Sequence, residues 1–232
     1  FYGSAMRMPH VQGAFTQHLV AHDWQCHKIA DGVSINEAAF AEPFAVTLHA
    51  VNRAGSLLGK RVLVTGCGPI GTLCIIAARA HGAQEIVATD VMDGVLQMAL
   101  KARADRVINV ADNAEDLAAY AANKGTFDVM FEASGNERAL RAGIEALKPR
   151  GILMQLGLGG DISIPQNLIV SKEIEIRGSF RFHEEFALAV DLINRSRVDL
   201  GALLTDVLPM AEAVKAFDLA SDRSRAMKVQ IA

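Results

Sequence analysis

The period of the hydrophobic and polar pattern changes repeatedly along most of the chain, as expected where strands alternate with helices. From Arg61 onward, short apolar runs predict buried strands at 62–65, 86–90, 107–110, 129–132, 152–156 and 174–177. The stretches between them have helical spacing and predict helices at 70–81, 94–104, 114–123, 137–147 and 166–171. Strands joined by crossover helices predict an α/β fold with a doubly wound, parallel, Rossmann-type sheet.

The two ends of the chain do not follow this alternation and predict parts of a second, mainly β domain. Residues 1–30 predict short strands, of which 15–20 is the clearest. Residues 183–232 predict helix, strand, helix and strand in that order.

The segment before the first strand of the sheet predicts two helices. Ser34 and Glu37 have the spacing of a capping box, which starts the first helix. Pro43 is expected to interrupt that helix and to leave Glu42 at the N-cap of a second one, closed by Gly55.

A G-x-G-x-x-G motif follows the first predicted strand. Gly66 lets the strand turn tightly, Gly68 lets the backbone approach a pyrophosphate, and Gly71 lets helix and strand pack closely. Pro69 and Ile70 open the next helix at its first turn, where a missing N–H costs little. Strand, loop and helix in this order predict a dinucleotide-binding site, although a glycine-rich turn alone would also give the motif.

Asp90 stands at the end of the second predicted strand, 19 residues after Gly71. Its carboxylate can accept hydrogen bonds from the ribose hydroxyls of an adenosine, and it would repel a phosphate on the 2′-oxygen. No Arg or Lys follows it within 91–95. The sequence therefore predicts NAD in preference to NADP.

Composition and charge limit the classes of partner that the chain is expected to bind. The 232 residues are 51% hydrophobic and 21% charged, with a net charge of −3, which is typical of a globular domain. There is no basic block for nucleic acid or an anionic membrane, and no apolar run has the length of a membrane span. Cys26, Cys67 and Cys74 lack metal-site spacing and favour a reducing, cytoplasmic location. We expect a small-molecule substrate.

Four segments together resemble the zinc-dependent medium-chain alcohol and polyol dehydrogenases: 42–50, 66–71, 131–135 and 178–182. The resemblance covers the whole chain and implies a substrate domain at 1–42 and 181–232, with a dinucleotide-binding domain at 43–180. It also implies that the chain is the carboxy-terminal two-thirds of such an enzyme, and that the main zinc ligands, a Cys and a His-Glu pair, lie before Phe1.

The resemblance assigns catalytic and metal-binding roles to Glu42, which would approach the zinc as a ligand or through water. A carboxylate at a helix start is also a common capping acid. Val46 would face the nicotinamide. His49 lies on the same helical face and could act as a proton relay, but it is interpreted as a packed helix histidine.

Arg181 and Phe182 occupy positions that contact substrate in the resembling enzymes. A guanidinium fork suits a carboxylate or vicinal hydroxyls, while an interdomain ion pair is an equal alternative for Arg181. Phe182 replaces a Tyr that is common there. Phe1 and Ser4 are also expected near the substrate.

Two segments at the ends of late strands match parts that approach the nicotinamide in the family. We expect their backbone amides to bind its carboxamide. These residues are Leu156, Gly157, Leu158, Ser179 and Phe180.

The reaction implied by the resemblance is oxidation of a secondary alcohol of a sugar acid, from L-idonate to 5-dehydrogluconate, with hydride transfer to NAD. Zinc would act as the Lewis acid on the alcohol oxygen. A sorbitol or threonine dehydrogenase of the same family and a non-catalytic NAD-binding fragment are the alternatives, and the segment alone is expected to be inactive. A homodimer or homotetramer is implied through the strand at 174–177.

Overall fold

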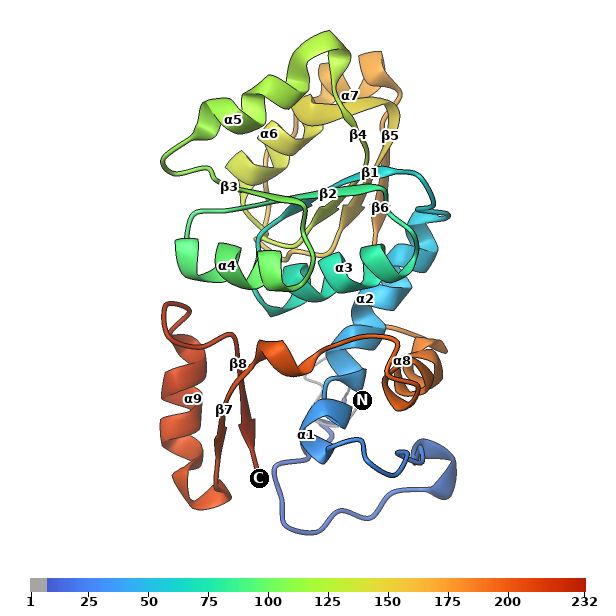
Figure 1. Ribbon diagram of the computed structural model, residues 1–232, viewed down its shortest axis with the longest axis vertical. Coiled ribbons are helices and arrows are strands. Elements are labelled where there is room, and N and C mark those ends of the chain that lie inside the picture. Colours follow the sequence, from blue (N-terminus) through green and yellow to red (C-terminus); the bar gives the residue numbers. More distant parts are fainter. Residues whose placement is uncertain (1–7) are drawn as a thin grey trace.

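The computed structural model describes residues 8–232. Its larger sheet is parallel throughout and has the strand order β3-β2-β1-β4-β5-β6 (Figure 1). This order confirms the predicted doubly wound α/β sheet. The strands are β1 (Arg61–Thr65), β2 (Glu85–Asp90), β3 (Arg106–Asn109), β4 (Phe127–Glu132), β5 (Leu147–Gln155) and β6 (Glu175–Gly178).

Helices cover both faces of this sheet (Figure 1). One layer contains α2 (Ala41–Ala54), α3 (Pro69–Ala80) and α4 (Asp93–Lys101). The other contains α5 (Ala114–Ala118), the 3-10 segment η2 (Ala119–Lys124), α6 (Glu137–Ala146) and α7 (Gln166–Lys172).

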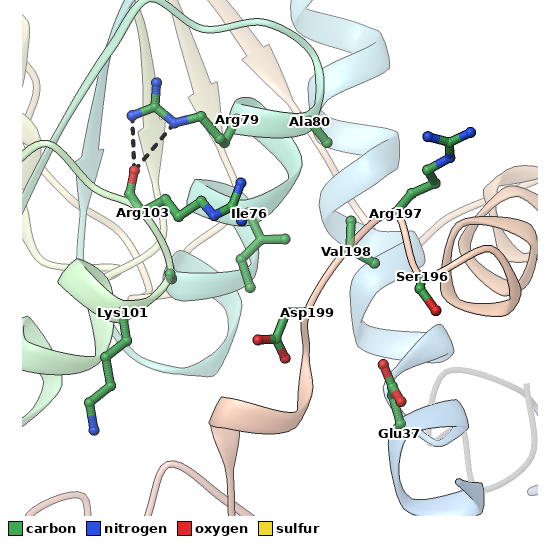
Figure 2. Close-up of a pocket in the computed structure, with 11 residues that line it drawn as sticks. Glu37, Ile76, Arg79, Ala80, Lys101, Arg103, Ser196, Arg197, Val198 and Asp199 are labelled. Carbon is green, nitrogen blue, oxygen red and sulfur yellow. Dashed lines mark hydrogen bonds between the residues drawn. The ribbon is translucent and has the colours of Figure 1, made fainter. Parts of the chain in front are cut away.

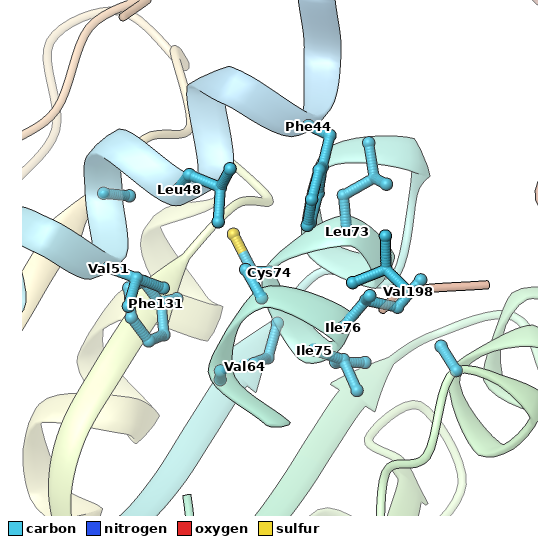
Figure 3. Close-up of a cluster of buried hydrophobic side chains, with 14 of the residues drawn as sticks. Phe44, Leu48, Val51, Val64, Leu73, Cys74, Ile75, Ile76, Phe131 and Val198 are labelled. Atoms are coloured by element: carbon cyan, nitrogen blue, oxygen red, sulfur yellow. The ribbon is translucent and has the colours of Figure 1, made fainter. Parts of the chain in front are cut away.

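Side chains alternate between two hydrophobic clusters because successive strand residues point to opposite faces. Val64 packs in the cluster with α2 and α3, whereas Leu63 packs in the cluster with α6. Figure 3 shows Phe44 and Leu48 of α2 meeting Cys74 of α3 above the sheet. Fully buried apolar side chains on both faces make this sheet the main source of stability.

The segment 148–151 forms a bulge inside β5. Phe127 pairs with Leu147 and Val129 pairs with Ile152, so several residues of β5 oppose a short stretch of β4. Pro149 and Gly151 lie in this stretch, and both residue types are typical of bulges because they interrupt a regular ladder.

The strands predicted before residue 30 are wrong for the described part, residues 8–30, which has no strand. The segment 15–20 is irregular, and Phe15, Leu19 and Val20 are exposed. A strand forms only where its backbone groups pair with a neighbour, and no described residue pairs with this segment. The regular structure within residues 8–30 is the 3-10 turn η1 (Asp23–Gln25). Phe1 and Ser4 lie outside the described residues.

The break between the two early helices falls earlier than predicted. Ser34 caps α1 (Ile35–Ala38) by accepting a hydrogen bond from the Glu37 amide over 3.1 Å. The second helix, α2, begins at Ala41 with Phe40 as its N-cap, so Glu42 lies inside the first turn and is not the N-cap. Pro43 fits there because first-turn amides have no acceptor within the helix.

The last fifty residues contain the predicted helix, strand, helix and strand. α8 (Glu185–Asn194) packs against α2, and β7 (Leu204–Leu208) pairs in parallel with β8 (Lys228–Ile231). Between these strands lie α9 (Ala213–Ser221) and the 3-10 turn η4 (Met210–Glu212), with η3 (Gly201–Leu203) before β7. Among residues 8–232, no helix combines the length and the apolar character that crossing a bilayer requires.

Candidate functional site

The glycine loop between β1 and α3 has the shape that the motif predicts. Gly66 has a φ of +86°, and a Cβ there would lie 2.8 Å from the Ser134 backbone. A Cβ on Gly71 would lie 1.7 Å from the Gly66 carbonyl oxygen, which leaves no room for a side chain. Gly68 is the N-cap of α3, and a Cβ there would meet only Arg223 at 3.4 Å. The loop is closely packed at Gly66 and Gly71 but has free space at Gly68, where a pyrophosphate needs to approach the backbone.

Asp90 borders this loop and is buried at the end of β2. Its Oδ2 accepts from the Cys67 amide over 2.7 Å, and its Oδ1 accepts from the amides of Val91 and Met92 over 2.7 and 3.2 Å. A carboxylate has about four acceptor positions, so about one is left for a ribose hydroxyl. That position is on Oδ2, the oxygen nearer to Arg223, whose Nη2 lies 3.9 Å away.

A second buried carboxylate, Glu132, ties together the strand ends next to the loop. It accepts from the amides of Ser134 and Gly135, from the Ser134 hydroxyl, and from Gln155 Nε2 over 2.7 Å. Thr65 Oγ1 at the end of β1 lies 3.4 Å from it. Glu132 thereby fixes the carboxyl ends of β1, β4 and β5 relative to one another.

A cavity of about 770 Å³ opens at the carboxyl ends of β5 and β6, where ligands of open α/β sheets bind. It brings together much of the predicted site, but Glu42, Val46, the glycine loop and Asp90 do not line it. Its walls are formed by Leu156, Gly157, Leu158, Ser179, Phe180, Arg181 and Phe182 from the predicted set, and by His49, Arg53, Gln155, Gly178 and His183.

The amides expected to bind a carboxamide are largely occupied. Those of Leu156 and Gly157 both donate to the Glu132 carbonyl, and the Ser179 amide donates to the Gln155 carbonyl over 2.9 Å. These three amides continue the sheet's hydrogen bonding, and a contact of this segment pair with the carboxamide stays a prediction. The Ser179 hydroxyl is buried, and none of the described residues forms a hydrogen bond with it. A buried polar atom without a protein partner is one that a ligand or a bound water can satisfy.

Arg181 enters this cavity from a left-handed backbone conformation, with a φ of +56°. Its guanidinium carbon lies 5.2 Å from the centre of the Phe180 ring, in a cation–π contact. Phe182 stacks on Phe186 at 5.7 Å and packs against the main core, so only part of its ring can face a ligand.

Glu42 is exposed in the first turn of α2, at some distance along the helix from His49 and Arg53. Displacement of water by the surrounding protein raises the pKa of its carboxyl, and the positive charges of Lys228 and Arg181 act in the opposite direction. Two cations from separate segments therefore act on this carboxylate. Val46 is half-buried one turn further along α2.

His49 is buried and paired with a carboxylate. Its Nδ1 lies 3.0 Å from Glu185 Oε1, and its ring packs edge-on against His183 at 5.2 Å. His49 lies in the cavity wall, and the pair joins α2 to α8.

The residues present fit a dinucleotide better than a zinc ion. The open glycine loop and the orphaned Ser179 hydroxyl are features that NAD would use. Among the described residues, no group of three or more His, Cys, Asp or Glu side chains lies close enough to hold a metal. Glu42 alone does not provide the three protein ligands of a catalytic zinc.

A separate cavity of about 390 Å³ lies between the ends of α3 and α4 and the segment after α8, and none of the predicted site residues lines it. Figure 2 shows the Arg79 guanidinium directed to the Arg103 carbonyl, with Glu37 and Asp199 on the opposite side. Cations and carboxylates are mixed around it, so its charge selects no ligand class.

Several residues in these sites were given no role by the sequence analysis, among them Glu132, Glu185, Lys228 and Arg223. Glu132 belongs to the segment 131–135 that was singled out for its resemblance, which was the available signal. The other three come from beyond residue 182, and no local pattern connects them with α2 or the glycine loop.

Comparisons with known proteins agree with this geometry. The zinc-binding dehydrogenase family model matches residues 69–195. L-idonate 5-dehydrogenase (NAD(P)(+)) of Escherichia coli K12 is 38% identical over 232 residues, which is 100% of this chain and 67% of that enzyme. Sorbitol dehydrogenase of Bos taurus is 33% identical over 212 residues, 89% of this chain and 59% of the relative. The chain thus spans about three-fifths to two-thirds of these relatives.

Solved structures give the same result. The crystal structure of L-idonate 5-dehydrogenase from Escherichia coli has a TM-score of 0.97 and 38% identity, over 100% of this chain and 67% of that one. 2R,3R-butanediol dehydrogenase from Bacillus subtilis has a TM-score of 0.82 and 26% identity, over 88% and 60%. The chain belongs to the zinc-dependent medium-chain alcohol and polyol dehydrogenases, a family of NAD(P)-dependent oxidoreductases.

Proposed function

We propose that this chain forms the cofactor-binding part and one wall of the substrate site of a dehydrogenase that oxidises L-idonate to 5-dehydrogluconate, with NAD as hydride acceptor. The observation that carries the proposal is Arg181, which reaches the cavity at the carboxyl ends of β5 and β6. A guanidinium there can bind the carboxylate of a sugar acid in a bidentate manner. The 38% identity to the Escherichia coli enzyme supports the same substrate.

Cofactor binding would use two separate groups of residues. The loop at Gly66, Gly68 and Gly71 would hold the pyrophosphate against the start of α3, and Asp90 Oδ2 would accept from the adenosine ribose. The Ser179 hydroxyl would bind the nicotinamide carboxamide at the opposite end. Bound NAD supplies the hydride acceptor, and the chain orients it at the sheet edge.

The wall around the nicotinamide would include Leu156, Leu158 and Phe180 through apolar contact. Val46 on α2 would add a further apolar contact. Glu42 remains our candidate for a carboxylate near the zinc that the family uses, with Lys228 and Arg181 balancing its charge. Because the described residues hold no complete metal site, we assign no reaction step to zinc.

The proposal is tested by measuring NADH formation from L-idonate and from sorbitol with the zinc-loaded enzyme that contains this chain. We expect kcat/KM for L-idonate to exceed that for sorbitol by about tenfold or more, since a hydrogen bond to a charged group is worth about 1.5–3 kcal/mol. Equal values for the two substrates would contradict the assignment of Arg181 to a carboxylate.

A sorbitol dehydrogenase is the second candidate, because the bovine enzyme is 33% identical over 89% of the chain. Sorbitol has no carboxylate, so higher kcat/KM for sorbitol would favour this candidate. Tight NAD binding without turnover of either substrate would favour a non-catalytic binding function.

We also propose that copies of the chain associate through β6 into a homodimer or homotetramer. β6 pairs with β5 on one side, and among the described residues nothing pairs with its other edge. An open apolar edge is usually covered, and Ile176 is 44% exposed there. Analytical ultracentrifugation tests this proposal. Three free cysteines support the cytoplasmic location.

A further inference from the structure

Arg223 comes from the far end of the chain and lies over the cofactor loop. It belongs to the turn between α9 and β8, which Figure 1 shows directed toward the helix layer containing α4. Asp222 shapes this turn: its Oδ1 accepts from the Ser224 amide over 3.0 Å, and its carbonyl accepts from the amides of Arg225 and Ala226. The position from which Arg223 extends is therefore set by hydrogen bonds.

Two distances place the guanidinium. Arg223 Nη2 lies 3.9 Å from Asp90 Oδ2 and 3.4 Å from the place of a Cβ on Gly68. The separation from Asp90 is that of an ion pair and is too long for a hydrogen bond. The Arg223 side chain is 60% exposed, against 6% for Asp90, and within residues 8–232 its N–H groups donate no hydrogen bond. The guanidinium can therefore serve a ligand at the rim of the loop.

We propose that Arg223 lets the adenosine end of this site accept a phosphate on the ribose 2′-oxygen, so that NADP is bound as well as NAD. Asp90 alone would repel that phosphate, and no cation follows it in 91–95. Arg223 supplies the missing positive charge from another part of the fold. Its planar fork matches a phosphate in a bidentate manner, while Asp90 still accepts from the ribose of NAD.

The pyrophosphate is the other phosphate within reach, because Arg223 also lies above Gly68. The two possible phosphate contacts of Arg223 differ in which ligands they affect. A pyrophosphate contact would serve NAD and NADP equally, whereas a contact to the 2′-phosphate serves NADP alone. The ion pair with Asp90, the residue at the ribose, favours the 2′-phosphate.

The inference rests on the proposed dinucleotide binding and is tested by calorimetry on the 232-residue chain, without substrate. The probes are NAD, NADP, 5′-AMP and adenosine 2′,5′-bisphosphate, and the last two isolate the 2′-phosphate from the pyrophosphate. Arg223→Ala is compared with Arg225→Ala, a matched change in the same turn, and with Arg223→Lys, which keeps a charge without the fork.

We expect the unchanged chain to bind both dinucleotides. Arg223→Ala should weaken the binding of NADP and of adenosine 2′,5′-bisphosphate by about tenfold or more, the usual loss for a hydrogen bond to a charged group. The affinities for NAD and 5′-AMP should stay within about twofold. Arg225→Ala should change none of them, and Arg223→Lys should recover part of the loss.

Three results would overturn the inference: binding of NAD alone by the unchanged chain, equal weakening of NAD and NADP in Arg223→Ala, or no weakening of either. Absence of any NAD binding by the unchanged chain would instead refute the proposed function.

Discussion

His49 and Glu185 form a buried pair, with Nδ1 and Oε1 3.0 Å apart, that joins α2 to α8. Glu185 also accepts from Asn52 Nδ2 over 3.2 Å and from the His183 amide over 2.9 Å. Burial raises the pKa of Glu185, but the hydrogen bonds from His183, His49 and Asn52 outweigh it and lower the pKa to about 2. The ionised carboxylate can only accept, so His49 Nδ1 carries the hydrogen.

This pair predicts a specific loss of stability in acid. The folded-state pKa of Glu185 lies below its ordinary value of 4.5, so its contribution is complete above that value and is lost as the pH falls toward about 2. The shift corresponds to about 3 kcal/mol of unfolding free energy. Glu185→Gln should remove it, and urea unfolding at several pH values measures the difference.

The matched control is Glu184→Gln, which changes the exposed neighbouring carboxylate. We expect the gap between wild type and Glu185→Gln to fall from about 3 kcal/mol at pH 7 to less than half of that near pH 3. A gap that stays constant over this range would mean that the charge of Glu185 does not stabilise the fold.

Two glycine-to-alanine changes should have opposite effects. A Cβ on Gly71 would lie 1.7 Å from the Gly66 carbonyl oxygen, whereas a Cβ on Gly94 would meet nothing within 4 Å. Gly71→Ala should destabilise the chain by about 1–3 kcal/mol or more, because helix α3 must move away from β1. Gly94→Ala lies in α4 and should be neutral or stabilising by up to about 1 kcal/mol.

Urea unfolding and NAD calorimetry on both variants check this prediction. Gly71→Ala should also lose NAD binding, since the loop at Gly66 and Gly68 depends on the same close packing. If Gly71→Ala were as stable as Gly94→Ala, the close approach of α3 to the loop would not exist in the protein.

The central sheet could be predicted because its information is local. Strands β1, β2 and β4 are buried on both faces and therefore read as apolar runs, as in Val62, Leu63 and Val64 of β1. The glycine loop was equally predictable, because a positive φ at Gly66 and a close approach at Gly71 are requirements of the backbone itself.

The contacts between distant segments could not be predicted in this way. Arg223 approaches Asp90 across more than half of the chain, and Glu185 meets His49 across a similar separation. The segment 15–20 has the apolar alternation of a strand, but pairing depends on a neighbour that local sequence does not specify. The start of α2 was predicted two residues too late, with Glu42 instead of Phe40 as the N-cap, because a Pro is tolerated throughout a first helical turn.

Ser179 offers a test that separates stability from binding. Its hydroxyl is buried without a partner, so Ser179→Ala removes an unsatisfied polar group and should leave stability unchanged or raise it by up to about 1 kcal/mol. The same change should weaken NAD binding by about threefold to tenfold, which corresponds to the loss of about one hydrogen bond to a neutral partner.

Thermal unfolding without ligand and calorimetry with NAD measure the two effects on the same sample. Ser171→Ala is the control, because Ser171 is exposed and its hydroxyl donates to the Leu168 carbonyl. A loss of stability in Ser179→Ala without any loss of NAD affinity would assign the hydroxyl to folding and remove it from the cofactor site.

Arg181 should separate substrate binding from cofactor binding. In the proposed site its guanidinium binds the carboxylate of L-idonate, beyond the nicotinamide and close to Phe180. Arg181→Ala should therefore raise KM for L-idonate by about tenfold or more, with little change in KM for NAD, since it removes a charge-assisted contact to one ligand only. Steady-state kinetics with each ligand varied in turn measures both constants.

Two further variants decide what the contact consists of. Arg181→Lys keeps the charge but loses the planar fork, so it should recover only part of the affinity for L-idonate if binding is bidentate. Arg53→Ala removes the other arginine of the same cavity and controls for a general loss of positive charge. Arg181 follows β6 in a left-handed backbone conformation that directs its side chain, whereas Arg53 lies on α2. Only Arg181 should therefore show the selective effect. Equal rises in both KM values would make Arg181 an interdomain ion pair and leave the carboxylate without a partner in this cavity.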